Sequence, residues 1–201
     1  MNGHGTVNVL RLLIAFILHN GLWTYHLRFF TDGQRTLQLA IFKAFSWYKS
    51  ISLILDWHHL EKKCKMQLSL ALNGRDVRNK VLHEVVHLLW YGLIDKAIEH
   101  LRAVDNRSIK NEIEVERLIG YFQRNRPYIP CYAVRKKLGL RNSSNKGEKM
   151  NDLVVSQRQK HNGMSWSASG SVALASLSAL RINGEHGKWF KENDVDFKLA
   201  A

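Results

Sequence analysis

The chain has few cysteines and few prolines. Among its 201 residues there are two of each, and the cysteines, Cys64 and Cys131, lie far apart without a CxxC motif. This content excludes a small domain held together by disulfides. A reducing compartment fits it best, so we predict a cytoplasmic protein.

The chain also lacks a run of apolar residues long enough to span a membrane. The candidate RLLIAFIL, at 11–18, has about seven apolar residues, whereas a spanning helix needs roughly 20. HNGLW follows in place of the small-residue cleavage site of a signal peptide. We therefore predict a buried helix in this segment and no membrane partner.

Acidic residues are scarce. Seventeen Asp and Glu stand against thirty Lys and Arg, which leaves a net charge of +13. This excess favours a polyanionic partner, with nucleic acid ahead of an anionic membrane surface. The alternative is that the positive charge only keeps the protein in solution.

The first sixty residues alternate between helical and strand patterns. Residues 8–20 have helical spacing and end at Asn20-Gly21, a common C-terminal cap. YHLRFF at 25–30 and SISLILD at 50–56 are typical of buried strands, and a helical pattern at 37–50 separates them. This order predicts an α/β fold with a parallel pair of strands.

From residue 60 to 125 the pattern is helical throughout. Four segments carry apolar residues three and four apart, and RPYIP at 126–130 ends the last of them because its prolines disfavour a helix. The remaining segments are a loop at 139–147, a helix at 148–160, a second helix at 171–182 and a polar tail at 184–201. We expect the tail to fray.

An aspartate ends each predicted strand. Asp32 follows the first strand, and Asp56 follows the second in the stretch DWHH, which places His59 one turn further on. The carboxyl ends of parallel strands are where α/β proteins bind ligands, so two acids at this edge could hold a divalent cation. For Asp56 the alternative is a structural role as the N-cap of the next helix.

Glu148 lies in the most basic part of the chain. A helix here would place Glu148, Asp152, Val155 and Gln159 on one face. Between Arg124 and Lys160 these two acids face ten Lys and Arg, and tyrosines are interleaved with them. Such a stripe favours contact with phosphates, and aromatic faces can stack on unpaired bases. The residues that we predict to bind DNA are Arg135, Lys136, Lys137, Arg141, Lys146, Lys149 and Lys160.

Three blocks of sequence then suggest a family. FFTDGQ, LILDWHHLEKKC and RNSSNKGEKMNDLVVSQRQKHNGMSW occur in this order and, taken together, the chain over roughly 10–183 resembles the DDE transposases of bacterial insertion sequences, with the Mutator-like branch nearest. The resemblance implies an RNase H-like catalytic core, here a partial one interrupted by an all-helical insertion. It also implies transposon-end DNA as the partner, and a dimer with itself or with an intact transposase.

The resemblance assigns roles to particular residues. Asp32 matches the family's second catalytic aspartate, and Glu148 its third acid, so both are expected to be catalytic and to bind Mg²⁺ or Mn²⁺. The family's C/D-x-x-H signature matches Asp56 and His59. In the family the helix of the third acid continues to an arginine and then to G-M-x-W. Here these positions match Arg158, Gly163, Met164 and Trp166. The implied reaction is metal-dependent cleavage and strand transfer of DNA.

One departure from the family pattern changes the expected activity. The family's first catalytic aspartate lies on an earlier strand, yet no Asp or Glu precedes Asp32. We therefore expect the C-terminal part of a transposase, with weak metal binding and no strand transfer by this chain alone. The alternative is a non-catalytic, DNA-binding remnant that competes with the intact transposase.

These patterns predict four parts of the chain. They are a partial RNase H-like core of the order helix-strand-helix-strand, a helical insertion, C-terminal core helices and a polar tail, at 1–59, 60–138, 139–183 and 184–201.

The stretch HEVVH at 83–87 has the spacing of a zinc peptidase, with two histidines four apart and a glutamate between them. Such an enzyme needs a third ligand, and no HxxGxxH extension follows. Glu112 or Glu116 could supply one only if the following helix folded back. The other interpretation is a helix that packs in the core through one apolar stripe, with the histidines beside it; its members are Leu82, Val85, Val86, Leu89 and Leu93.

Overall fold

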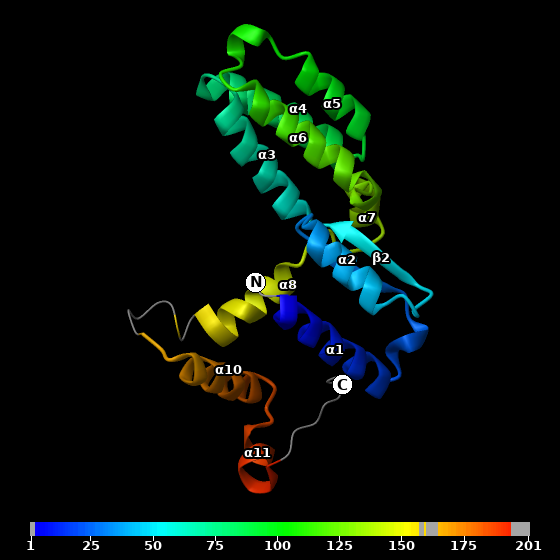
Figure 1. Ribbon diagram of the computed structural model, residues 1–201, viewed down its shortest axis with the longest axis vertical. Helices are drawn as coiled ribbons and strands as arrows, with labels where there is room; N and C mark the ends of the chain where they lie inside the picture. The colour runs from blue at the N-terminus through cyan, green and yellow to red at the C-terminus, as the bar shows by residue number, and fades with distance from the viewer. Residues whose placement is uncertain (1–2, 157–158, 160–164, 194–201) are drawn as a thin grey trace. The chain divides into compact units, whose positions relative to one another are not determined.

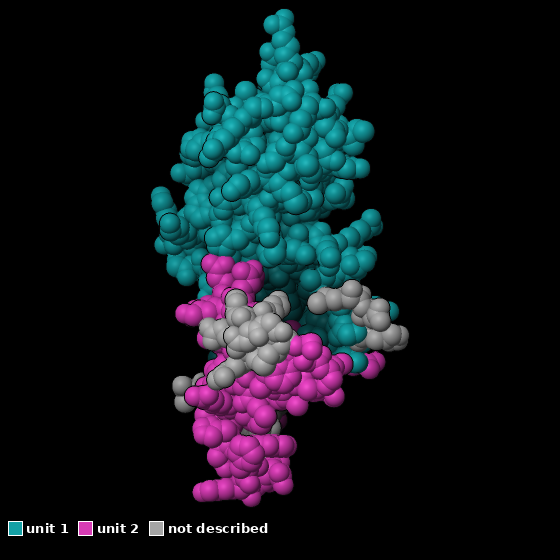
Figure 2. Space-filling view, turned by 90° about the vertical axis from the view of Figure 1, so that its left-hand side faces the viewer, with its two compact units in different colours: residues 1–10, 25–143 teal, residues 11–24, 144–201 magenta. Residues whose placement is uncertain are grey.

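The structure is a computed structural model that describes residues 3–156, 159 and 165–193. The chain divides into two compact units, shown in separate colours in Figure 2. Unit 1 comprises residues 1–10 and 25–143, and unit 2 comprises residues 11–24 and 144–201. The described residues are mostly helical and include one two-stranded parallel sheet, so the predicted combination of helices with a parallel strand pair is confirmed.

The sheet of unit 1 is built from a strand-helix-strand segment. Strand β1 (Leu27–Thr31) leads through helix α2 (Arg35–Ala44) to strand β2 (Ile51–Leu55). The register runs from Leu27 opposite Ile51 to Thr31 opposite Leu55. Both strands therefore end at the same edge of the sheet, as the sequence predicted.

Helix α2 is shorter than its apolar pattern indicated. It ends at Ala44, whereas the sequence predicted a helix to residue 50. The chain turns there because aromatic side chains pack on one another in place of a further helical turn: the Phe45 and Trp47 rings stack at 6.3 Å between centroids, and the Trp47 indole donates to the Ala44 carbonyl at 3.0 Å. Phe45 is fully buried at this turn.

Four helices follow the sheet, which confirms the predicted helical region. They are α3 (Trp57–Ala71), α4 (Arg75–Trp90), α5 (Ile94–Arg102) and α6 (Glu112–Asn125), and Figure 1 shows them side by side. A short 3₁₀ turn, η2 (Asn106–Ser108), precedes α6. The core of unit 1 lies among these helices and the end of β2. Its fully buried members include Leu60, Leu68, Val85, Leu89, Leu118 and Phe122.

The segment after α6 contains a helix that the sequence did not predict. The RPYIP stretch forms the 3₁₀ turn η3 (Arg126–Tyr128), as expected for a helix end, and α7 (Tyr132–Lys137) follows it. Tyr132 is fully buried, and its hydroxyl donates to the Leu55 carbonyl at 2.7 Å. This contact fixes α7 at the end of β2.

The remaining elements belong wholly or partly to unit 2. Helix α1 (Gly3–His19) crosses the division between the units and ends before Gly21, whose positive φ of 64° confirms the predicted cap. The predicted burial of 11–18 is wrong, because Leu12 and Leu18 are more than half exposed and Ile17 is the buried residue of this stretch. After it comes the 3₁₀ turn η1 (Leu22–Thr24). The later elements are α8 (Asn145–Asn151), the π-helical η4 (Asp152–Ser156), α10 (Ala168–Ile182) and α11 (His186–Glu192). Helix α11 corrects the expectation of a frayed tail from residue 184, although residues 194–201 lie outside the described part.

Within the described residues, each helix is too short or too polar to cross a lipid bilayer.

Candidate functional site

The two strand-end aspartates lie at the same edge of the sheet. Thr31 pairs with Leu55 in the register, and the Asp56 amide donates to the Thr31 carbonyl at 2.8 Å. Asp32 and Asp56 therefore follow paired residues of neighbouring strands. The sequence predicted this juxtaposition, but the two carboxylates have different environments.

Asp56 is an N-cap. Its side chain is almost fully buried, and Oδ1 accepts hydrogen bonds from the backbone amides of His58 at 2.9 Å and His59 at 3.3 Å. These amides open α3, where the helix dipole favours a negative charge. Asp56 and the backbone of His59 thus act together in folding, as the structural interpretation of the DWHH motif expected, while the His59 ring is exposed.

Asp32 is exposed and sits in a turn held by α6. Its Oδ1 accepts from the Gln34 amide at 3.0 Å, and its carbonyl accepts from the Tyr121 hydroxyl at 3.1 Å. Gly33 has a φ of 88°, and a Cβ on it would lie 2.9 Å from the Tyr121 ring and 3.1 Å from Asn125 Oδ1. The turn therefore requires glycine, and its close approach to α6 fixes where the Asp32 carboxylate leaves the sheet.

A hollow of about 580 Å³ opens beside Asp32, between α3 and α6. Lys63, Arg117 and Arg124 line it together with Asp32, so cationic side chains from two helices gather near the strand-end carboxylate. Tyr121 also lines the hollow, and its burial raises the pKa of the phenol above its usual value of 10.0.

A second carboxylate, that of Glu114 on α6, lines the same hollow. It is nearly buried and accepts hydrogen bonds from Gln67 on α3 and from Arg117 one turn along α6. Its charge is therefore already matched within the protein. The sequence did not single out Glu114, Lys63, Arg117 or Arg124, because only the packing of α6 against α3 brings them to Asp32.

Glu148 lies in the first turn of α8, on unit 2, and its side chain is exposed. The helix predicted over 148–160 is confirmed in part: α8 ends at Asn151, a π-helical segment follows to Ser156, and residue 159 is helical. The Asp152 amide donates to the Glu148 carbonyl, so these two residues stand one turn apart along the helix. The wider turns of the π-helical segment change the spacing after Asp152.

The remaining residues of the third block are only partly within the described chain. Arg158, Lys160, Gly163 and Met164 lie outside it. Trp166 is 41% exposed and stands just before Ser167, the N-cap of α10, whose hydroxyl accepts from the Gly170 amide at 3.1 Å. Trp166 is thus part of the entry into α10.

The basic residues predicted to bind DNA differ in their surroundings. Arg135 is half-buried and donates to Asn142 Oδ1 at 3.1 Å and to the Arg141 carbonyl at 2.5 Å. Burial, together with the nearby Arg28, lowers its pKa from the usual 12.5. Arg135 therefore supports the loop that follows α7. The side chains that remain exposed are those of Lys136, Lys137, Arg141, Lys146 and Lys149, with the first three on unit 1 and the others on unit 2.

Asn142 joins this loop to the sheet edge. Its carbonyl accepts from the Trp57 amide at 3.0 Å, and its side-chain amide donates to the Tyr132 carbonyl at 2.9 Å. The start of α3, the start of α7 and the Arg135 side chain thus meet at one residue. Through it, the basic end of α7 is held next to the end of β2.

The HEVVH stretch lies on α4 as a regular helix. Val85 and Leu89 are fully buried and Val81 nearly so, whereas Leu82 and Val86 are half-buried and Leu93 is 41% exposed. The core face is therefore rotated from the predicted stripe toward Val81. His83 and His87 are exposed beside it, as expected.

The carboxylates of unit 1 do not fit a two-metal centre of the transposase type. Asp56 caps a helix, Glu114 is matched by Gln67 and Arg117, and Asp32 is left with cationic neighbours. Across the described residues, no three or more His, Cys, Asp or Glu side chains are grouped so that they could hold a metal ion. The described residues of unit 1 therefore lack the carboxylate arrangement that metal-dependent cleavage requires.

Comparisons with protein-family models, with curated proteins and with solved structures found no match to this chain.

Proposed function

We propose that this chain is a DNA-binding protein related to the C-terminal part of a DDE transposase, and that it does not cut or join DNA by itself. The order of the motifs around Asp32, Asp56 and Glu148 supports the relationship, which would give the sheet an RNase H-like origin. The natural target would be the ends of a transposon, where the chain could pair with itself or compete with an intact transposase.

The observation that carries DNA binding is the hollow beside Asp32. Lys63, Arg117 and Arg124 line it, and Arg117 is held in place by Glu114. Cationic side chains beside a hollow can contact the phosphates of a nucleic acid backbone. Lys136 and Lys137 on α7 add exposed positive charge, and Lys136 Nζ lies 5.9 Å from the centroid of the Trp90 ring.

The carboxylate inventory supports the lack of catalysis. Phosphodiester transfer by this chemistry needs two metal ions between several carboxylates that are open to solvent. Asp32 is the exposed carboxylate that lines the hollow in unit 1, while Glu148 belongs to unit 2.

The test compares double variants that each remove two positive charges. One changes Lys63 and Arg124 to Ala, the second changes Lys136 and Lys137, and a control changes the exposed Lys80 and Lys96 on other surfaces. Affinity for a fluorescent duplex is measured against salt concentration. We expect the first two variants to weaken binding to all sequences and to lower the salt slope by roughly 2 each.

The control variant should keep the salt slope of the unchanged protein. Equal slopes for all three variants would mean that only the overall charge attracts DNA, and the surface proposed above would be wrong. Absence of salt-dependent binding by the unchanged protein would overturn DNA binding altogether.

The relationship to transposases has a separate test. The DNA that encodes the chain can be read upstream of Met1 in all three frames. A frame that encodes further strands, one of them with an aspartate, would support an origin from a transposase gene. If no upstream frame encodes such strands, the result would count against the relationship to transposases. The DNA-binding proposal would still be tested by its own measurements.

A further inference from the structure

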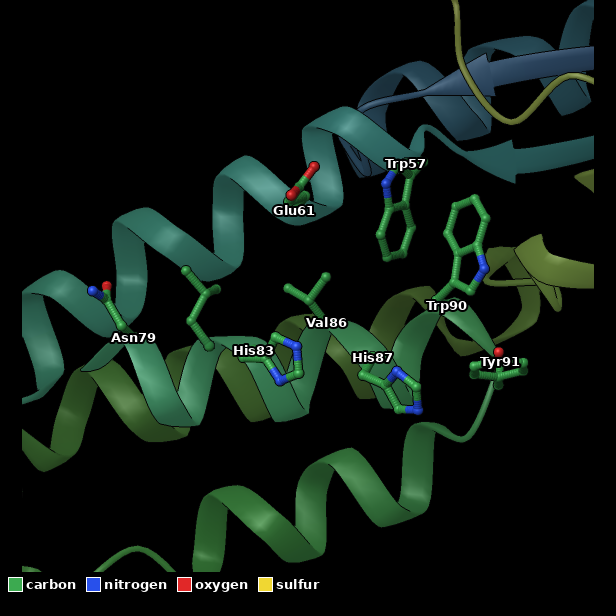
Figure 3. Close-up of a pocket in the computed structure, with 9 residues that line it drawn as sticks. Trp57, Glu61, Asn79, His83, Val86, His87, Trp90 and Tyr91 are labelled. Carbon is green, nitrogen blue, oxygen red and sulfur yellow. The ribbon is translucent and has the colours of Figure 1, made fainter. Parts of the chain in front are cut away.

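A second hollow of unit 1 lies between α3 and α4, away from Asp32. It has a volume of about 470 Å³, and Figure 3 shows its lining residues. Trp57 and Glu61 come from α3, and His83, His87 and Trp90 come from α4. The proposed DNA surface uses none of these side chains, so the hollow calls for a separate explanation.

The two histidines stand one turn apart on the same side of α4. Figure 3 shows them next to each other along the helix, and their rings are nearly parallel, with an angle of 15° and 6.4 Å between centroids. The side chain of His83 is 79% exposed, so water and small ions can reach it. Two imidazoles four residues apart on a helix can converge on one metal ion by small changes of rotamer.

A neighbouring side chain contacts each of the two imidazoles. Glu84 Oε1 lies 3.5 Å from Nδ1 of His83. When Nε2 of an imidazole binds a metal, a carboxylate beside Nδ1 can accept the proton of Nδ1, as second-shell carboxylates do in metalloproteins. The Tyr91 ring packs against the His87 ring at 5.1 Å between centroids and restricts its orientation.

We propose that His83 and His87 form a binding site for one divalent transition-metal ion, of the class Cu²⁺, Ni²⁺ or Zn²⁺. Imidazole nitrogen is a preferred ligand of these ions, whereas Mg²⁺ prefers oxygen. Two protein ligands leave the other coordination positions to water, so the site is open and exchangeable. It differs from the peptidase interpretation of HEVVH, because that chemistry needs a third protein ligand.

The experiment is a titration of the full chain, purified without metal-affinity resin, with Ni²⁺ and with Cu²⁺. Calorimetry follows Ni²⁺, and quenching of tryptophan fluorescence follows Cu²⁺, since Trp57 and Trp90 line the same hollow. We expect one saturable site, with Cu²⁺ bound more tightly than Ni²⁺. The His87→Ala variant should bind each ion roughly tenfold or more weakly, because the second ligand acts at a high effective concentration.

The His58→Ala variant is the matched control. It also removes one exposed imidazole, but from α3 and outside the pair, so it should bind like the unchanged protein. His87→Gln preserves a polar side chain on the helix and should lose affinity as His87→Ala does. Equal affinity of His87→Ala and the unchanged protein would overturn the site, as would the absence of saturable binding. DNA binding is measured separately, so failure of one proposal leaves the other in place.

Discussion

At the scale of single residues, the two strand-end aspartates show how the surroundings decide the role of a carboxylate. Asp32 and Asp56 follow paired residues of β1 and β2. Asp56 is buried at the start of α3, where its carboxylate accepts hydrogen bonds from backbone amides. Asp32 is exposed and lines a hollow. The sequence predicted both acids at the same edge, but Asp56 is itself the N-cap of α3, whereas Asp32 stands two residues before Gln34, the N-cap of α2.

The cap makes a direct prediction for stability. We expect Asp56→Ala to lower the free energy of unfolding by about 1 to 2 kcal/mol, because the His58 and His59 amides lose their acceptor at a buried helix end. Asp56→Asn should lose less, since an amide oxygen can still accept. Urea denaturation followed by circular dichroism measures both.

Asp76 provides the control for this prediction. It is an exposed aspartate in the first turn of α4, where Gly74 holds the N-cap position. Asp76→Ala should change the free energy of unfolding by no more than about 0.5 kcal/mol. If Asp56→Ala cost no more than Asp76→Ala, the cap would not be the main role of Asp56.

At the scale of elements, the sequence predicts long amphipathic helices well and short segments poorly. Helices α3 to α6 follow from apolar spacing because each buries one continuous face. Helix α7 has only six residues, and a hydrogen bond from Tyr132 to the distant Leu55 holds it. Such a contact leaves no periodic signal, so α7 could not be predicted from the sequence.

The candidate site follows the same rule. Asp32 was predictable because a strand pattern ends at it, and the parallel pairing placed Asp56 beside it. Lys63, Arg117 and Glu114 could not be predicted, because they reach the hollow only when α6 packs against α3. The local sequence pattern therefore predicts that Asp32 lies at the end of a strand. The side chains that surround Asp32 depend on tertiary packing.

The hydrogen bond of Tyr132 makes the second stability prediction. Tyr132→Phe removes the donor at 2.7 Å and leaves the Leu55 carbonyl buried without it, so we expect a loss of about 1 to 2 kcal/mol in the free energy of unfolding. Tyr25→Phe, at a side chain that is 64% exposed, is the control and should have little effect. Equal stability of the two variants would show that α7 is held by apolar packing alone.

At the scale of the whole molecule, the excess of positive charge and the scarcity of acids both favour a polyanionic partner. The chain carries +13, and its exposed cations occur on both units. A polyanion can contact many of these side chains at once, and affinity then depends on the number of phosphates neutralised. The same scarcity of acids agrees with the proposal that the chain does not cut DNA by itself, because hard divalent cations need several oxygen ligands in one place.

This proposal makes the last prediction, which concerns the intact chain. Supercoiled plasmid incubated with the purified protein and Mg²⁺ or Mn²⁺ should show no more nicking than with the Asp32→Asn variant, because among the residues that the structure describes no three or more ligating side chains are grouped to hold a metal ion. Glu148→Gln, which changes the other acid that matches the family, serves as a second comparison. Nicking by the unchanged protein that both variants lose would prove that Asp32 and Glu148 act together, and the chain would then be an enzyme. Nicking that both variants retain would come from a contaminating nuclease, since neither of the two matched acids would take part in it.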